Sequence, residues 1–211
     1  MKNLLIIGAG GMGREIFNLA KECTGFNNEY SIKGFLDDNP ESLAKFDSFY
    51  PPIISSISDY NITDDDVFVC SLGNVNLKKK CIEIILNKGG KFISLIHPKA
   101  IIYETSVIGE GCIVFPYAIV GSDTKIGNYV LLQSFCSIAH DVIIGNFSRI
   151  DVQTLCVGGV KIGDCVTLHS SSIINHNVTV ESYSVVGAQS FVIKNVKKGT
   201  TVHGNPAIRL K

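Results

Sequence analysis

Hydrophobic residues recur at every sixth position along the C-terminal half of the chain. This repeat starts at Ile96 and continues without interruption to the region of Lys197. Sixteen of the seventeen residues in its first position are aliphatic, and in order they are Ile96, Ile102, Ile108, Val114, Val120, Ile126, Leu132, Ile138, Ile144, Ile150, Cys156, Ile162, Leu168, Ile174, Val180, Val186 and Val192. Neither a helix nor a hairpin meander has a period of six. The pattern therefore predicts short units that bury their apolar faces only by stacking on copies of themselves.

The fifth position of each unit predicts how the chain turns. It holds only small or β-branched residues, which are Ala100, Ser106, Cys112, Ala118, Thr124, Val130, Cys136, Val142, Ser148, Thr154, Val160, Val166, Ser172, Val178, Ser184, Ser190 and Val196. If one unit is a short strand and a corner, three units make a triangular coil with the aliphatic residue inside. Stacking five to six such coils at about 4.8 Å gives a prism roughly 27 Å tall.

The first 95 residues show the alternating pattern of a small parallel sheet flanked by helices. Continuous apolar runs predict strands over residues 4–7, 32–36, 67–70 and 92–96. Helical spacing joins two further sets, the first being Ile16, Phe17, Ala20 and Cys23 and the second Leu77, Cys81, Ile84 and Ile85. We therefore expect a Rossmann-like domain over residues 1–95 and a β-helical domain with a C-terminal cap over residues 96–211.

Composition narrows the class of protein. The chain has 211 residues with 45% hydrophobic residues, and 19 basic side chains balance 19 acidic ones. This balance argues against a nucleic-acid or anionic membrane partner. The apolar run from Leu4 to Ile7 is too short for a signal peptide or a membrane span, so we expect a cytoplasmic protein. Seven cysteines without a CxxC pair indicate free, buried thiols and no zinc site.

A glycine-rich turn follows the first predicted strand. Gly8, Gly10 and Gly13 have G-x-G-x-x-G spacing, Gly11 lies among them, and Asp37-Asp38 follow about two dozen residues later. Such a turn lets backbone amides approach phosphate oxygens, while a carboxylate at the next strand end accepts hydrogen bonds from a ribose or base. A tight turn that binds nothing remains an alternative. A nicotinamide dinucleotide is a third, but the domain is short for it, so one phosphate-bearing nucleotide fits better.

Several motifs together resemble one family of enzymes. They are Gly8 to Gly13, residues 34–38 (GFLDD), Leu72-Gly73-Asn74, residues 96–100 (IHPKA), residues 139–145 (AHDVIIG) and residues 202–207 (VHGNPA). In this order they resemble the nucleotide-sugar N-acetyltransferases that acetylate 4-amino-sugars and the related sialic-acid O-acetyltransferases. The resemblance implies a left-handed β-helix that holds acetyl-coenzyme A, and a small domain that holds the nucleotide with Gly73 and Asn74 among its contacts. It also implies a homotrimer with active sites between subunits.

The resemblance also assigns roles at one corner of the prism. His140 falls where these acyltransferases carry their general base, and an imidazole accepts a proton near neutral pH. Asp141 would orient it, although the family more often has glutamate here. Gly158 would offer its backbone amide to the thioester oxygen, with Ala188 as a further acetyl-coenzyme A contact. Arg149 stands where some relatives carry a histidine.

From the residues alone, simpler roles remain open at these positions. Residues 122, 140, 158, 176 and 194 are spaced by 18 and would stack at one corner, where a polar side chain normally points to solvent. Gly158 next to Gly159 would then be only a permissive turn. His140 and His176, two coils apart at roughly 10 Å, would be too far apart to share one metal ion within a subunit. A zinc carbonic anhydrase with histidines from adjacent subunits is thus disfavoured.

One outward column of the prism predicts self-association. It reads Ile101, Ile119, Ser137, Leu155, Ile173 and Phe191, whereas the next column reads Val107, Lys125, Ile143, Lys161, Thr179 and Lys197. An exposed apolar strip is unfavourable in a monomer, so we expect the first column to face another subunit or, alternatively, the N-terminal domain. The sequence as a whole predicts an acetyl-CoA-dependent N-acetyltransferase that needs no metal. O-acetylation of a sialic acid or other sugar hydroxyl and a non-catalytic nucleotide-binding scaffold are the alternatives.

Overall fold

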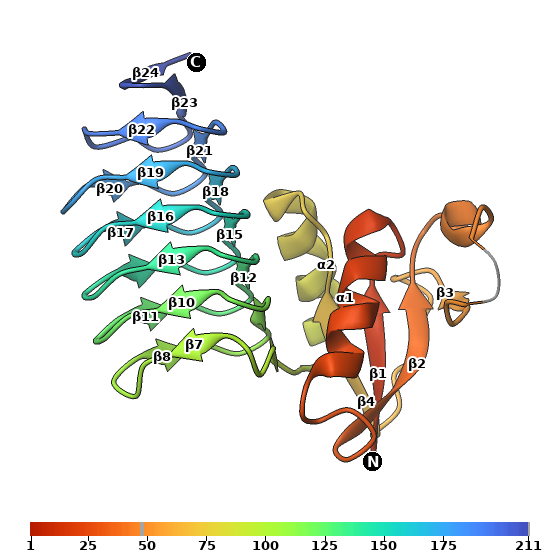
Figure 1. Ribbon diagram of the computed structural model, residues 1–211. Helices are drawn as coiled ribbons and strands as arrows, with labels where there is room; N and C mark the ends of the chain where they lie inside the picture. Colours follow the sequence, from red (N-terminus) through yellow and green to blue (C-terminus); the bar gives the residue numbers. More distant parts are fainter. Residues whose placement is uncertain (47–48, 211) are drawn as a thin grey trace. The chain divides into compact units, whose positions relative to one another are not determined.

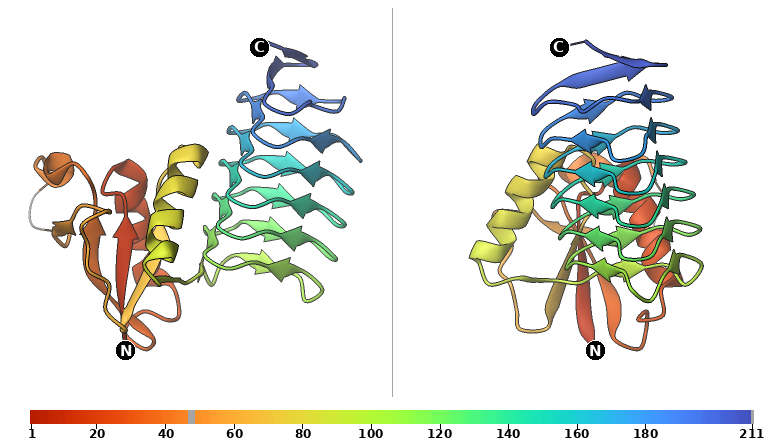
Figure 2. Two further views of the ribbon diagram at one scale, coloured as in Figure 1. Left: turned by 180° about the vertical axis from the view of Figure 1, so that it is seen from behind. Right: turned by 90° about the vertical axis from the view of Figure 1, so that its left-hand side faces the viewer.

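The structure is a computed structural model that describes residues 1–46 and 49–210. The chain forms two compact units, Met1–Pro98 and Lys99–Lys211 (Figure 1). The first unit contains a sheet with helices, and the second consists of short strands stacked in regular layers (Figure 2). Within the described residues, none of the helices has the length and apolar character needed to cross a bilayer.

The first unit is built on a five-stranded parallel sheet in the order β3-β2-β1-β4-β5. Its strands are β1 (Lys2–Ile7), β2 (Tyr30–Leu36), β3 (Ile53–Ser55), β4 (Asp66–Cys70) and β5 (Lys91–Phe92). Its helices are α1 (Gly11–Glu22), α2 (Val75–Asn87) and the 3-10 turn η1 (Pro40–Leu43), and β6 (Leu95–Ile96) ends the unit. Leu4 to Ile7 are completely buried because β1 is the central strand of a sheet covered on both faces.

Two details of this unit differ from the sequence prediction. Leu77 is exposed, whereas the inner face of α2 carries Cys81, Ile82 and Ile85. The prediction failed there because Leu77 lies in the first turn, where Asn74 caps the helix and sets its rotation. The short edge strand β3 was also missed, since three residues give too little alternation to detect.

The second unit is a prism of three parallel sheets, each named here by its order along the chain. The first prism sheet contains β7 (Ile101–Ile102), β10 (Ile119–Val120), β13 (Ser137–Ile138), β16 (Leu155–Cys156), β19 (Ile173–Ile174) and β22 (Phe191–Val192). The second contains β8 (Val107–Ile108), β11 (Lys125–Ile126), β14 (Ile143–Ile144), β17 (Lys161–Ile162) and β20 (Thr179–Val180). The third includes β9 (Ile113–Val114), β12 (Leu131–Leu132), β15 (Arg149–Ile150), β18 (Thr167–Leu168), β21 (Val185–Val186), β23 (Thr201–Gly204) and β24 (Ala207–Arg209).

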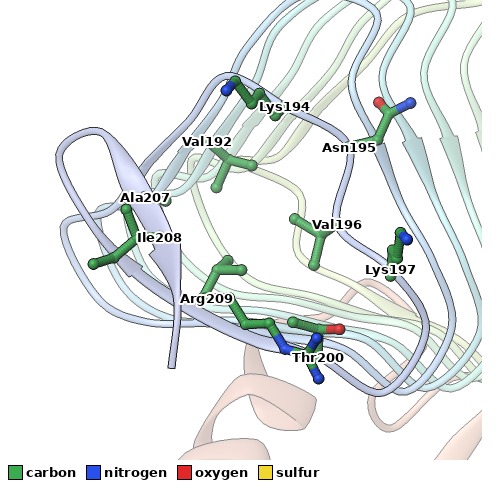
Figure 3. A pocket seen from close by; sticks show the side chains of 10 residues that line it. Val192, Lys194, Asn195, Val196, Lys197, Thr200, Ala207, Ile208 and Arg209 are labelled. Atoms are coloured by element: carbon green, nitrogen blue, oxygen red, sulfur yellow. The ribbon is translucent and has the colours of Figure 1, made fainter. Parts of the chain in front are cut away.

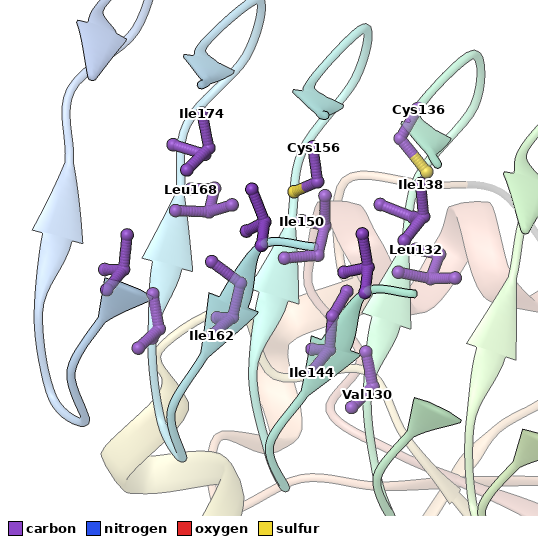
Figure 4. Packing of buried hydrophobic residues seen from close by; sticks show 14 of the residues in the cluster. Val130, Leu132, Cys136, Ile138, Ile144, Ile150, Cys156, Ile162, Leu168 and Ile174 are labelled. Carbon is purple, nitrogen blue, oxygen red and sulfur yellow. The ribbon is translucent and has the colours of Figure 1, made fainter. Parts of the chain in front are cut away.

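Each strand pairs with the strand 18 residues away, as the hexad pattern predicted. Ile119 pairs with Ser137, and Ser137 pairs with Leu155. The second residue of each strand points inward, where Leu132, Ile138 and Ile144 belong to one continuous apolar core (Figure 4). The predicted prism and its parallel stacking are therefore confirmed.

The corners of the prism require an uncommon backbone conformation. Nearly every corner contains one residue with a positive φ near 60°, which is the left-handed region. At one corner these residues are Asp123, Asp141, Gly159 and Asn177, three residue types that tolerate this region best. The corner sequence is thus constrained by backbone geometry before any functional demand acts on it.

A buried carboxylate ties the end of the first unit's sheet together. Asp66 is buried at the start of β4 and accepts hydrogen bonds from the Lys33 Nζ at 3.0 Å, the Tyr60 hydroxyl at 2.8 Å and the Thr63 amide at 2.8 Å. Burial by itself raises the pKa of this carboxyl, but the donated hydrogen bonds outweigh that effect and lower its pKa to about 2.

This shift predicts how stability depends on pH. A carboxyl whose folded pKa lies below its unfolded value of about 3.9 stabilises the fold above that pH and loses its contribution as pH falls toward 2. The lost contribution is about 2 kcal/mol. We expect Asp66→Asn to be less stable at pH 7 and to lose less between pH 4 and pH 2.5 in urea unfolding. Asp65→Asn, an exposed neighbour, is the control. Parallel pH profiles for wild type and Asp66→Asn would contradict the assignment.

Candidate functional site

His140 lies at the corner that connects the first prism sheet to the second. It follows β13 and precedes β14 in the chain. Its carbonyl accepts a hydrogen bond from the Gly159 amide at 3.0 Å, and the Gly158 carbonyl accepts one from Asn177 at 3.2 Å. These bonds stack the corners of successive coils in register. We call the stacked positions 140, 158, 176 and 194 the His140 corner.

The imidazole of His140 is paired with the carboxylate of the next residue. The His140 Nδ1 lies 2.7 Å from the Asp141 Oδ2, and the two side chains are 62% and 66% exposed. The left-handed backbone of Asp141 places its side chain beside the ring. This contact fixes which ring nitrogen faces the carboxylate and leaves Nε2 for another partner. The shorter aspartate therefore reaches the histidine.

Gly158 provides the space that the imidazole occupies. A Cβ atom built on Gly158 would lie 2.6 Å from both Cε1 and Nε2 of His140. No side chain larger than hydrogen fits there unless the ring moves. Among the described residues, the Gly158 N–H has no hydrogen-bond acceptor. The sequence suggested Gly158 as a backbone donor or a turn, but its contact with His140 was not foreseen.

His176 lies closer to His140 than the coil spacing predicted. The two ring centroids are 6.5 Å apart, compared with the expected 10 Å, because both rings lean over Gly158, which has no side chain to separate them. Within the described ranges no group of three or more His, Cys, Asp or Glu side chains is arranged to hold a metal ion.

Ala188 does not lie beside His140 in one chain. It is exposed at the corner between β21 and β22, which connects the third prism sheet to the first. Near this corner, which we call the Ala188 corner, the structure shows a polar cluster that the sequence did not reveal. Asp151 is buried there between Arg149 and His169. The 18-residue spacing of Asp151 and His169 was visible, but nothing in the sequence indicated that the carboxylate is buried.

The loops predicted to bind a nucleotide gather at the carboxyl edge of the first unit's sheet. The Ser71 hydroxyl donates to the carbonyls of Ile7 at 2.7 Å and Gly8 at 2.9 Å, which joins the ends of β4 and β1. β2 and β3 lie on one side of β1, and β4 and β5 lie on the other. The two loops therefore border the point where the strand order reverses, which is where open α/β sheets bind ligands.

The glycines of this turn have different structural roles. Gly13 packs against the Gly8 carbonyl, since an added Cβ would lie 2.1 Å from that oxygen. A Cβ on Gly10 would meet open space, and one on Gly11 would lie 3.8 Å from Arg14. Gly10 caps α1 without a side-chain hydrogen bond, and the first turn of the helix carries no acidic residue. The amides at this helix start are therefore suited to an anion.

The predicted polar contacts already bond to the protein's own backbone. Asp37 accepts from the Ala9 amide at 2.7 Å and from the Asn39 amide at 2.8 Å. Asp38 accepts from the Ile57 amide at 3.0 Å. The Asn74 side-chain oxygen caps α2, and the adjacent Gly73 precedes that cap. Each of these side chains therefore has a structural role in holding the loops together.

A cavity of about 330 Å³ opens at the C-terminal end of the prism (Figure 3). Its apolar lining includes Val192 and Val196, and its basic lining includes Lys194, Lys197 and Arg209. Lys194 belongs to the His140 corner, three coils beyond His140, and no acidic residue follows Glu181 in the sequence. The end of the prism is thus positively charged.

The prism, its paired histidine and its glycine-lined neighbour define a protein of the hexapeptide-repeat class. Residues 3–85 match the family described as the PglD N-terminal domain. A UDP-N-acetylbacillosamine N-acetyltransferase from Bacillus subtilis (strain 168) is 29% identical over 115 residues, which are 54% of this chain and 51% of that protein. The chain thus spans about half the length of this curated relative.

Solved structures match over the whole chain. The acetyltransferase domain of PglB from Neisseria gonorrhoeae FA1090 has a TM-score of 0.89 and 25% identity over 100% of both chains. The same domain in complex with acetyl coenzyme A is 26% identical over 99% of each chain, again with a TM-score of 0.89. A perosamine N-acetyltransferase from Caulobacter crescentus, 19% identical over 100% of this chain and 98% of that one, shares the fold with a TM-score of 0.89. These matches confirm the left-handed β-helix and the resemblance predicted from the sequence.

The close approach of Gly158 to His140 predicts a selective effect of one methyl group. The backbone of Gly158 lies outside the left-handed region, so Gly158→Ala should fold with little change in melting temperature. The new Cβ must displace the imidazole and break its contact with Asp141. We expect the ring resonances of His140 in an NMR spectrum to shift while core methyl resonances stay in place. Unchanged His140 resonances would show that the ring does not occupy this position.

Proposed function

We propose that the chain is an acetyl-CoA-dependent N-acetyltransferase that acts on the amino group of a nucleotide-linked amino-sugar. The observation that supports this most strongly is the His140 and Asp141 pair over Gly158 in a prism that matches a PglB acetyltransferase domain along its whole length. That domain binds acetyl coenzyme A, and the curated relative is named for an amino-sugar substrate. Seven buried cysteines without a disulfide suit a cytoplasmic location.

His140 has the position and chemistry of a general base. An amine that attacks a thioester carbonyl must lose a proton as the new C–N bond forms, and the C–S bond then breaks to release a thiol. The Nε2 atom of His140 is free of the Asp141 contact and takes that proton. Asp141 stabilises the imidazolium that results. The proton then passes to the departing sulfur, so the histidine returns to its starting state.

Gly158 contributes in two ways. The missing side chain lets His140 lie close to the prism and leaves a notch between His140 and His176. Its backbone N–H, without an acceptor in the described part of the chain, donates to the thioester oxygen as negative charge develops there. No covalent intermediate on the protein is required, since Cys136 and Cys156 are buried in the core.

The His140 corner also provides a track for the acyl donor. From His140 to Lys194 it rises three coils, or about 14 Å at 4.8 Å per coil. A pantetheine arm lying along this corner carries its phosphates toward the basic C-terminal end, where Lys194, Lys197 and Arg209 meet. The acyl donor thus runs from an anion-binding end to the general base.

The first unit holds the nucleotide part of the acceptor. The amides at the start of α1, at Gly10 and Gly11, face phosphate oxygens. The Asp37 carboxylate beside Ala9 repels a phosphate at that point but accepts hydrogen bonds from a ribose or base. Gly73 and Asn74 border the same crevice from the end of β4. The identity of the base and the sugar is a matter for assay.

A homotrimer with active sites between subunits completes the proposal. On the first prism sheet, Ile101 and Ile173 are exposed, and at its edge the exposed rings of Tyr117 and Phe135 stack with centroids 5.1 Å apart. An apolar face of this extent marks an interaction surface, and most such oligomers close symmetrically. The same face offers the repeated side of a threefold assembly.

O-acetylation of a sugar hydroxyl is the alternative, because His140 removes a proton from either nucleophile. The two products differ in chemistry: mild alkali cleaves an acetyl ester and leaves an acetamide intact. Treating the product with base therefore separates the two activities once turnover is found.

The general-base role predicts a large and specific loss of activity. With acetyl-CoA and a panel of nucleotide-linked amino-sugars, and thiol release as the readout, His140→Ala should lower kcat by about 10²- to 10⁴-fold while fold and assembly persist. Asp141→Asn keeps the turn but removes the charge and should lower kcat by a smaller factor. Asp123→Asn is a matched control, because Asp123 has the same left-handed backbone one coil earlier.

Three results would count against this proposal. If wild type releases no thiol with any amino-sugar of the panel, the scaffold alternative is favoured. If His140→Ala retains full turnover, His140 is not the base. Equal losses in Asp141→Asn and Asp123→Asn would assign Asp141 a role in the turn alone.

The apolar face predicts the assembly. Ile173→Lys places a charge in the first prism sheet and should convert a trimer into a monomer in light scattering after size exclusion. Ile143→Lys is the matched control, because Ile143 has similar exposure, 44% compared with 38%, but lies in the second prism sheet. A trimer that persists in Ile173→Lys and dissociates in Ile143→Lys would place the interface on the other sheet.

A further inference from the structure

A second histidine and carboxylate pair lies at the other edge of the first prism sheet. Asp151 follows β15 with only 4% of its side chain exposed. Its Oδ1 accepts from the Arg149 Nε at 2.5 Å, and its Oδ2 accepts from the Arg149 Nη2 at 3.0 Å. The same Oδ2 lies 3.1 Å from the Nδ1 of His169, whose side chain is 43% exposed.

The physical character of this cluster differs from that of His140 and Asp141. A buried ion pair is stable only when its geometry is good and its remaining lone pairs are satisfied. The two-pronged contact with Arg149 meets the first condition, and the His169 ring meets the second. The carboxylate is therefore rigid and charged, and it holds the Nδ1 of His169 as a hydrogen-bond donor. The Nε2 atom of His169 is left as an acceptor at the protein surface.

The position of His169 relates it to the groove of the proposed reaction. It directly follows β18 and leads into the Ala188 corner, whereas His140 lies at the opposite edge of the first prism sheet. In a closed ring of identical subunits, each contact joins two different patches, so the His140 edge of one copy meets the other edge of the next. His169 is 29 residues beyond His140, about 8 Å higher along the prism. That height lies between those of Gly158 and His176.

We propose that His169 contacts the acyl donor from the neighbouring subunit, with Asp151 and Arg149 as its positioning residues. The inference rests on the proposed function. At this height the groove holds the pantetheine arm, beyond the reacting carbonyl. The amide groups of that arm carry N–H donors, and the fixed Nε2 of His169 accepts one of them. His169 thereby selects an amide-bearing acyl carrier and leaves proton transfer to His140.

Coenzyme A binding tests this directly by isothermal titration of the assembled protein. His169→Leu removes the acceptor and should weaken coenzyme A binding about five- to tenfold, as expected for the loss of one hydrogen bond. His169→Gln retains an acceptor oxygen and should restore most of the affinity. Lys161→Ala, on the second prism sheet, is the control. In turnover, His169→Leu should raise the KM for acetyl-CoA and leave kcat and the KM for the sugar substrate near wild type.

An NMR measurement tests the positioning role without turnover. The ¹⁵N shifts of the His169 ring should show one tautomer in wild type and a mixture in Asp151→Asn, and coenzyme A should shift the Nε2 signal in wild type only. Equal coenzyme A affinity in His169→Leu and wild type would overturn the inference. If wild type itself binds no coenzyme A, the proposed function fails instead, so the two failures are distinguishable.

Discussion

The hydrogen-bonded pairing of each strand with the strand 18 residues away is the constraint on which the prism depends. It brings equivalent positions of the repeat into vertical columns, as with Ser137, Leu155 and Ile173. An aliphatic residue in the first position therefore always meets another one, and a polar corner residue always meets another corner. A shift of one residue in any coil would turn its core side chain outward and break every column at once.

The corners remain closed because the small fifth-position residues bond across them. The Thr124 hydroxyl donates to the Ala139 carbonyl at 2.7 Å, and the Ser148 hydroxyl donates to the Gly163 carbonyl at 2.9 Å. Both hydroxyls are buried, so these bonds satisfy carbonyls that the short strands leave unpaired. The bond from Thr124 joins the corner just before His140 to the coil below it. The rigidity of the candidate site thus originates in residues that make no contact with a ligand.

The sequence predicted the parts of the structure that repetition determines. Six copies of one strand made the period of Ile102, Ile138 and Ile174 unmistakable, and the corner column that joins His140 to Gly158 followed from counting. Features that depend on a single side chain were not predictable. The lean of His176 toward His140 and the burial of Asp151 arise from three-dimensional packing between coils.

The first unit shows the same limit in another form. Asp37 was predicted as a ligand contact because carboxylates follow the second strand in nucleotide-binding sheets. The structure adds that this carboxylate already bonds the Ala9 amide within the glycine-rich turn. A charge in that place both shapes the turn and excludes a phosphate from the same amide, so the phosphate must lie farther along, toward Gly10 and Gly11. One residue therefore sets the order in which the parts of a nucleotide are arranged along the crevice.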